Sequence, residues 1–123
     1  MAFQIKFINF TNPYNWYRKA SLFVLLSRYE GMPNVLLEAL SHKIPLIISK
    51  ETSEAITFIK NNKSGIILKN NSFLEAGSKI NLLANNYEMR KKLGFEGYKT
   101  IKKFAQFNKI YLLWKKEITQ WRQ

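Results

Sequence analysis

Short runs of apolar residues punctuate the first half of the chain and predict its strands. The first run alternates apolar with polar positions, which is typical of a strand with one covered face. The second, LFVLL, is apolar on both faces, as a central strand of a parallel sheet would be. Two shorter runs follow, the first of them led by a proline. The pattern therefore predicts strands at 4–10, 22–26, 45–49 and 65–68.

Amphipathic stretches between and after these runs predict helices. Asn12-Pro13 is a typical helix start, and Ser72-x-x-Glu75 has the spacing of a capping box. Gly94 and Gly97 indicate a break within one of the later helices. The predicted helices are 12–19, 33–42, a turn or two within 53–61, 72–84, 88–104 and 108–122.

Alternation of strands and helices predicts an α/β fold, with a parallel sheet of about four strands covered by helices. A doubly wound domain usually has more strands, and here the last three helices follow one another without a strand between them. The pattern is therefore that of a partial Rossmann-like domain covering residues 1–123. Such a half-sheet has an open edge, which favours pairing with another segment.

Composition narrows the classes of protein. The chain has 123 residues, enough for one domain, and a formal net charge of +12, which favours anionic partners such as nucleic acid, anionic lipid or phosphorylated ligands. It has no cysteine, no aspartate and one histidine, His42. Disulfides and thiolate metal sites are thereby excluded, and a clustered Asp/His metal site is disfavoured. With no signal-like segment and no apolar run near the length of a membrane span, we expect a cytoplasmic protein.

Two glutamates stand out in the stretch SRYEGMPNVLLEAL. Gly31 permits a tight turn after the strand and Pro33 suits the first turn of a helix, so Glu30 is expected in the loop and Glu38 on the helix. Open α/β sheets bind their ligands outside the carboxyl ends of the strands, where this loop lies. Spacing alone favours the simpler interpretation, that Glu30 and Glu38 are ordinary loop and helix-surface acids.

The start of this helix offers free backbone amides. Met32, at the cap position, has no side-chain oxygen, so the amides of Asn34 and Val35 remain available, and such a helix start favours a phosphate. Glu38 falls at the margin of a wide apolar arc, where a carboxylate is costly unless it is hydrogen-bonded. Hydroxyls of a sugar or ribose would satisfy it.

The string LFVLLSRYEGMPNVLLEALSHKIPLIIS closely resembles the C-terminal domain of the GT4 family of glycosyltransferases, retaining enzymes of the GT-B fold. The family signature S-x-x-E-G-x-P-x-x-x-x-E-A is met without gaps, and a proline-led strand follows it. Weaker similarity extends over KFINFTNPYNWYRKASLFV, NNKSGIIL and EMRKKLGFEGYKTIKKF, so the resemblance covers nearly the whole chain. The matching residues are Ser27, Glu30, Gly31, Pro33, Glu38, Ala39 and Pro45.

The resemblance implies a role for each residue of the signature. Glu30 would be the catalytic residue and contact hydroxyls of the donor sugar, and Glu38 would accept hydrogen bonds from the nucleotide ribose. The segment between them would face the sugar and diphosphate of the donor: Gly31, Met32, Pro33, Asn34 and Val35. The family needs no metal. The implied function is donor binding in a hexosyltransferase of cell-surface polysaccharide or glycolipid synthesis.

The chain also departs from the family pattern. His42-Lys43 replaces a small residue and glycine at the helix end, and KETSEAIT replaces a glycine-rich turn. A non-glycine residue in a left-handed conformation there costs about 1 kcal/mol. The acceptor-binding domain and the Arg and Lys that clamp the diphosphate have no counterpart. We therefore expect the isolated chain to be inactive, with the missing domain as its partner.

Two other functions stay open. One is a non-catalytic half-enzyme that pairs with another chain through its open sheet edge. The other is a basic nucleic-acid-binding module, for which no RRM, KH or helix-turn-helix signature is visible.

The predicted last helix has an apolar stripe that could pack on the sheet, contact the missing domain, or lie on an anionic membrane surface. Its members are Ile110, Trp114, Ile118 and Trp121.

Overall fold

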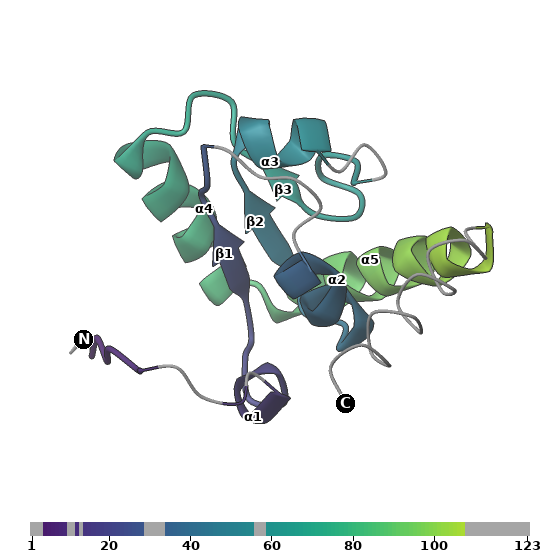
Figure 1. Cartoon of the computed structure of the whole chain (residues 1–123). Helices are drawn as coiled ribbons and strands as arrows, with labels where there is room; N and C mark the ends of the chain where they lie inside the picture. Colours follow the sequence, from purple (N-terminus) through teal and green to yellow (C-terminus); the bar gives the residue numbers. More distant parts are fainter. Residues whose placement is uncertain (1–3, 10–11, 13, 29–33, 56–58, 108–123) are drawn as a thin grey trace.

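The computed structural model describes residues 4–9, 12, 14–28, 34–55 and 59–107, without the side chains of 54–55 and 105–107. The described chain is an α/β fold with a parallel sheet in the order β1-β2-β3 (Figure 1). The fold class predicted from the sequence is thus confirmed, with three strands in the described part of the chain. The elements are α1 (Tyr14–Tyr17), β1 (Phe23–Leu25), α2 (Asn34–Ser41), β2 (Leu46–Ile48), α3 (Lys50–Ala55), β3 (Ile66–Ile67), α4 (Phe73–Ala84) and α5 (Tyr87–Phe107).

The central strand β2 is buried on both faces and divides the core in two. Leu46 and Ile48 pack into one cluster with residues of α2. Ile47, which points to the opposite face, packs into a second cluster with residues of α4. This alternation is what a strand produces, since successive side chains point to opposite faces. Helix α5 serves both clusters, through Leu93 in the second and Ile101 in the first.

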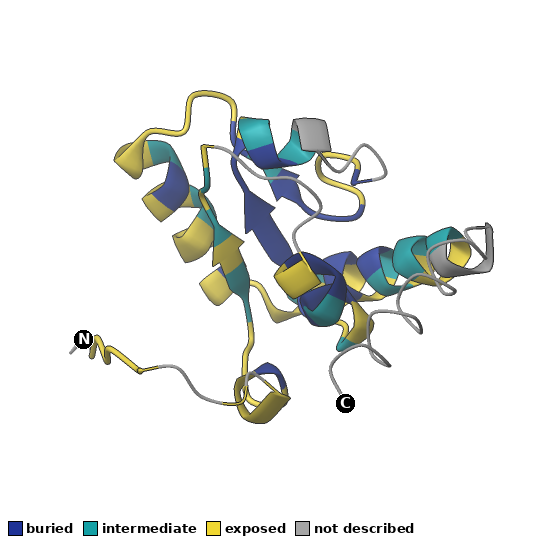
Figure 2. Cartoon of the chain, in the orientation of Figure 1, coloured by how far each residue is buried: buried dark blue, intermediate teal, exposed yellow. Residues whose placement is uncertain are grey.

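Strand β1 lies at an edge of the sheet, not at its centre as the sequence predicted. It pairs in parallel with β2 alone among the described strands, and Val24 and Leu26 remain 36% and 42% exposed (Figure 2). The apolar run 22–26, which contains β1, was apolar enough for burial on both faces. The order of strands in a sheet depends on which strands pair, and composition does not determine that. Within the described residues, the other edge of this apolar strand has no neighbouring strand.

Residues 4–9 do not form the predicted first strand. The segment has no regular structure and extends away from the sheet, with Ile5 81% and Phe7 95% exposed (Figure 1). Alternating apolar positions favour a strand only where a neighbouring strand supplies hydrogen bonds, and no described strand pairs with this segment. Phe10 lies outside the described residues.

Helix α3 begins at Lys50, earlier than the predicted segment 53–61, and its described part extends to Ala55; 56–58 lie outside the described residues. The reason for the early start is Ser49, the single residue between β2 and α3, whose hydroxyl accepts a hydrogen bond from the Thr52 amide at 3.2 Å. This is the position and geometry of an N-cap, so the helix starts directly after the strand.

Helix α5 is continuous, without the break predicted at Gly94 and Gly97. Both glycines face close neighbours. A Cβ atom on Gly97 would lie 2.6 Å from Leu40 Cδ2, and one on Gly94 would lie 3.0 Å from the carbonyl carbon of Lys43. The two glycines therefore let α5 approach the C-terminal end of α2, and they do so without interrupting the helix.

The end of α2 confirms the strain predicted for a residue that is not glycine. Lys43 has φ = 59°, in the left-handed region. The amide of Ile44 donates to the Ala39 carbonyl at 3.1 Å, and the amide of Lys43 to the Leu40 carbonyl at 3.0 Å. This is the Schellman pattern, which satisfies carbonyls at the helix end. The Lys43 ammonium also lies 5.0 Å from the ring centroid of Tyr98 on α5.

The capping box predicted for α4 is formed in one of its two halves. The Ser72 hydroxyl accepts a hydrogen bond from the Glu75 amide, as predicted. The Glu75 carboxylate binds instead the amides of Lys69 and Asn70, in the loop after β3. These backbone hydrogen bonds lower the pKa of Glu75 below its ordinary value.

Other predictions concern the end of the chain. The predicted helix 108–122 and the tryptophans of its stripe lie outside the described residues. Within the described ranges, the structure contains no helix with the length and apolarity that a membrane crossing requires.

Candidate functional site

Helix α2, which follows β1 in the chain, carries part of the predicted site. It begins at Asn34, and both Asn34 and Val35 are exposed, so the start of the helix is open to solvent. Acidic side chains are absent from its first turn, and an amide-rich helix start of this kind attracts anions. The other predicted residues, Glu30 and Gly31–Pro33, lie outside the described residues.

Glu38 lies just over one turn into α2 and is half-buried. Its neighbours Leu37 and Ala39 are 7% and 0% exposed, so the helix presents an apolar face beside the carboxylate. One carboxylate oxygen, Oε2, accepts a hydrogen bond from the Tyr17 hydroxyl at 2.9 Å. The sequence predicted that a carboxylate at the edge of the apolar face of α2 needs hydrogen-bond donors. The Tyr17 hydroxyl is one such donor.

Tyr17 is the residue that sequence reasoning missed. It comes from α1 and is 6% exposed, packed with Leu36 and Leu40 in the cluster between α2 and the sheet. Burial first, and then the Glu38 carboxylate, raise the pKa of Tyr17 to about 12. The phenol is protonated at neutral pH, as an ordinary tyrosine is, and donates its hydrogen to the carboxylate. No sequence signal pairs the two residues, because a strand separates them.

His42 lies beside Glu38 and Tyr17, at the end of α2. Its Nδ1 lies 2.8 Å from the Glu38 backbone carbonyl, so Nδ1 carries a hydrogen and donates it. The Ser41 hydroxyl donates to the same carbonyl at 2.6 Å. The imidazole ring lies 5.3 Å from the ring of Tyr17 and 5.9 Å from that of Tyr14. His42 is thus a helix-end residue that packs on the two tyrosines of α1.

Buried hydroxyls join the carboxyl ends of β1 and β2. The Ser49 hydroxyl donates to the Ser27 carbonyl at 2.6 Å and lies 2.8 Å from the Thr52 hydroxyl. Ser49 and Thr52 are 1% and 0% exposed. Ser27 is the first residue of the signature, so this contact fixes the point from which the chain leaves the sheet toward Glu30.

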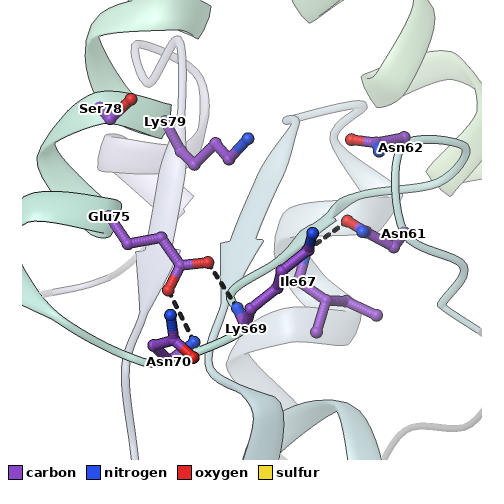
Figure 3. A pocket seen from close by; sticks show the side chains of 8 residues that line it. All are labelled: Asn61, Asn62, Ile67, Lys69, Asn70, Glu75, Ser78 and Lys79. Carbon is purple, nitrogen blue, oxygen red and sulfur yellow. Dashed lines mark hydrogen bonds between the residues drawn. The ribbon is translucent and has the colours of Figure 1, made fainter.

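A separate depression of about 350 Å³ lies beside β3 and the first turns of α4 (Figure 3). Glu75 extends across it to the amides of the loop after β3, and Asn61 Oδ1 accepts a hydrogen bond from the Ile67 amide at 2.9 Å. Its lining contains none of the predicted site residues. The lining residues are Asn61, Asn62, Ile67, Lys69, Asn70, Glu75, Ser78 and Lys79.

Among the described residues, acidic and histidine side chains do not gather in groups of three or more that could hold a metal ion. The polar groups around Glu38 are instead hydroxyl donors and a backbone carbonyl. What this arrangement offers a ligand is a hydrogen-bond-accepting carboxylate and, one turn earlier, the solvent-exposed start of the same helix.

Comparison with known proteins shows which family the chain resembles. The profile of the family described as "Glycosyl transferases group 1" matches residues 2–100. The capsular polysaccharide biosynthesis glycosyltransferase CapM of Staphylococcus aureus is 30% identical over 74% of the chain and 24% of its own length. The Vi polysaccharide biosynthesis protein VipC/TviE of Salmonella typhi is 45% identical over 43% of the chain and 9% of its own length.

Two more relatives agree. An alpha-1,4-N-acetyl-D-galactosaminyltransferase of Campylobacter jejuni, whose substrate is linked to undecaprenol through a diphosphate, is 32% identical over 63% of the chain and 21% of its own length. The crystal structure of the C-terminal domain of LpcC, a glycosyl transferase group 1 family protein of Francisella tularensis, matches with a TM-score of 0.68 and 26% identity. That match covers 80% of this chain and 51% of the LpcC domain.

The chain therefore spans less than a quarter of these three curated relatives and about half of the solved domain. The length of the match, the α/β fold and the Glu-x7-Glu segment agree with one another. The chain belongs to the glycosyl transferases group 1 family.

Proposed function

We propose that residues 1–123 are part of the C-terminal, nucleotide-sugar-binding domain of a retaining GT4 hexosyltransferase that acts in cell-surface polysaccharide or glycolipid synthesis. The proposal rests on one observation above all, the joint placement of an open helix start and a half-buried carboxylate on α2. Relatives that act in polysaccharide biosynthesis support the wider setting. The enzyme would work at the cytoplasmic side of the membrane.

Each part of α2 has a role in this proposal. The amides at its start, including those of Asn34 and Val35, hold the donor diphosphate, which a helix N-terminus favours through its partial positive charge. Glu38 accepts hydrogen bonds from the ribose hydroxyls. Glu30 contacts hydroxyls of the donor sugar close to the bond that breaks, together with the segment Gly31–Pro33.

The reaction is transfer of a sugar with retention of its anomeric configuration. The bond between the sugar and the diphosphate breaks, the nucleoside diphosphate leaves with the electron pair, and an acceptor hydroxyl forms the new bond and gives its proton to the leaving diphosphate oxygen. Fixed positive charge near the leaving diphosphate stabilises the transition state. Helix α2 supplies part of that charge. The acceptor site and the basic clamp belong to the rest of the enzyme, so we expect the isolated chain not to transfer sugar.

Calorimetric titration with UDP and GDP tests donor binding. We expect one of the two nucleotides to bind, and Glu38→Gln to weaken its binding by about five- to tenfold, since a hydrogen bond to a charged acceptor contributes about 1–1.5 kcal/mol more than one to a neutral acceptor. Glu88→Gln, on the exposed first turn of α5, is the matched control and should bind as the wild type does. Equal affinity in all three proteins would contradict the assignment of Glu38.

Turnover distinguishes the two glutamates. In the complete enzyme, Glu30→Ala should reduce kcat severely with little change in nucleotide affinity, whereas Glu38→Ala should mainly raise KM for the donor. The physical reason is that one side chain faces the reacting sugar and the other the ribose. Similar losses of kcat in both variants would overturn this division of roles.

We also propose that the donor binds without a metal ion. Nucleotide affinity and turnover should be the same in EDTA as in magnesium, because the amides of α2 take the role that a bound cation has elsewhere. Loss of binding in EDTA, restored by magnesium, would show that the diphosphate is held through a metal.

A non-catalytic half-enzyme is the second candidate, favoured by the free apolar edge of β1. Val24 and Leu26 are part-exposed there, and the chain covers 51% of the solved LpcC domain. In this case the chain would form a stable complex with a protein that supplies the remaining strands, and the complex would not turn over nucleotide sugars. Turnover by the complex would exclude this candidate.

A further inference from the structure

We propose that Tyr17 is a positioning residue for the donor site, holding Glu38 in the orientation that receives the ligand. The inference rests on the proposed role of Glu38 in ribose binding and adds a residue from outside the Glu-x7-Glu segment. Tyr17 belongs to α1, which precedes β1 in the chain, so the site would be assembled from two separate segments.

The contact is specific and enclosed. The Tyr17 hydroxyl donates to Glu38 Oε2 at 2.9 Å, while the ring is 6% exposed and packs with Leu36, Ala39 and Leu40. A ring fixed in this way has little freedom to follow the carboxylate. The carboxylate is therefore the group that is held, and its orientation is set by the packing of α1 against α2.

Charge and protonation suit the same role. Glu38 is an acceptor, and the Tyr17 phenol is protonated at neutral pH, as tyrosine ordinarily is; burial and the carboxylate raise its pKa further, to about 12. The hydrogen bond is therefore present whenever a ligand binds. With Oε2 engaged by Tyr17, Oε1 is the oxygen that receives a ribose hydroxyl, and a second acceptor position remains on Oε2.

Fixing a flexible side chain before binding raises affinity because less conformational entropy is lost when the ligand arrives. Glutamate is among the side chains that lose the most rotamer freedom when they are ordered. Removing the Tyr17 hydroxyl while keeping the ring should therefore weaken nucleotide binding by about five- to tenfold. The effect should appear in KM for the donor and leave kcat nearly unchanged.

The experiment compares Tyr17→Phe, Glu38→Gln and the double variant by calorimetric titration with UDP and GDP. If Tyr17 acts through Glu38, Tyr17→Phe weakens binding in the wild-type background and has no further effect in Glu38→Gln, which is a non-additive cycle. Tyr14→Phe is the matched control. Tyr14 is on the same helix with its ring 6.3 Å from that of Tyr17, and it is 50% exposed.

The outcomes separate this inference from the proposed function. Weak binding by Glu38→Gln with normal binding by a folded Tyr17→Phe would overturn the inference and leave the proposed function intact. Additive losses in the double variant would assign Tyr17 a merely structural role and also overturn the inference. No binding of either nucleotide by the wild-type protein would overturn both. A five- to tenfold loss in Tyr17→Phe, absent in Tyr14→Phe and non-additive with Glu38→Gln, would support it.

Discussion

Replacing Gly94 with alanine should destabilise the protein, although alanine is the better helix former. A Cβ atom at this position of α5 would lie 3.0 Å from the Lys43 carbonyl carbon and still closer to its oxygen. Real Cβ atoms essentially never approach so closely, and the neighbour is backbone in a left-handed conformation at the end of α2. Helix α5 must therefore move away from α2.

The size of the effect follows from two opposing contributions. Overpacking a well-packed contact costs about 1–3 kcal/mol, and the upper value applies because the obstructing atoms are backbone that cannot rotate away. Replacing glycine by alanine inside a helix contributes about 1 kcal/mol in the opposite direction. We therefore expect the free energy of unfolding to fall by about 2 kcal/mol.

Urea denaturation followed by far-ultraviolet circular dichroism measures this change. Gly77→Ala, in the exposed part of α4, is the matched control because a Cβ atom there would have no neighbour within 4 Å. It should raise the free energy of unfolding by about 0.5–1 kcal/mol. If Gly94→Ala stabilised the protein as much as Gly77→Ala, the close approach of α5 to α2 would be refuted.

Two further changes test the contacts that hold the loops. Ser49→Ala should lower the free energy of unfolding by about 1–3 kcal/mol, because it leaves the Ser27 carbonyl and the Thr52 amide without their partner; a urea titration showing less than about 0.5 kcal/mol would contradict this. Glu75→Gln should flatten the acid side of the stability curve. The folded pKa of Glu75 is lowered, so its contribution is fully present above the ordinary glutamate pKa and is lost as the pH falls through the folded value. Parallel curves for the two proteins would show that the backbone hydrogen bonds of Glu75 do not stabilise the fold.

Local sequence chemistry determined much of the architecture. The apolar runs around β2 and β3, the helix α2 after its glycine and proline, and the Ser72 cap of α4 all appear where the pattern predicted them. In each case the signal lies within a few neighbouring residues, so the prediction does not depend on contacts with distant parts of the chain. The Glu-x7-Glu segment likewise identified the family, because its residue types and spacing are local.

Tertiary structure decided the features that depend on distant partners. Apolar alternation could not reveal that 4–9 pairs with none of the described strands, or that β1 lies at an edge of the described sheet. The sequence also could not show whether the glycines of α5 break the helix or let another segment pack closely against it. Either role depends on the absence of a side chain, so the sequence looks the same in both cases. The hydrogen bond between Tyr17 and Glu38 joins residues on two helices with a strand between them. Only the packing of α1 against α2 brings them together, because no local pattern specifies which hydroxyl a carboxylate will meet.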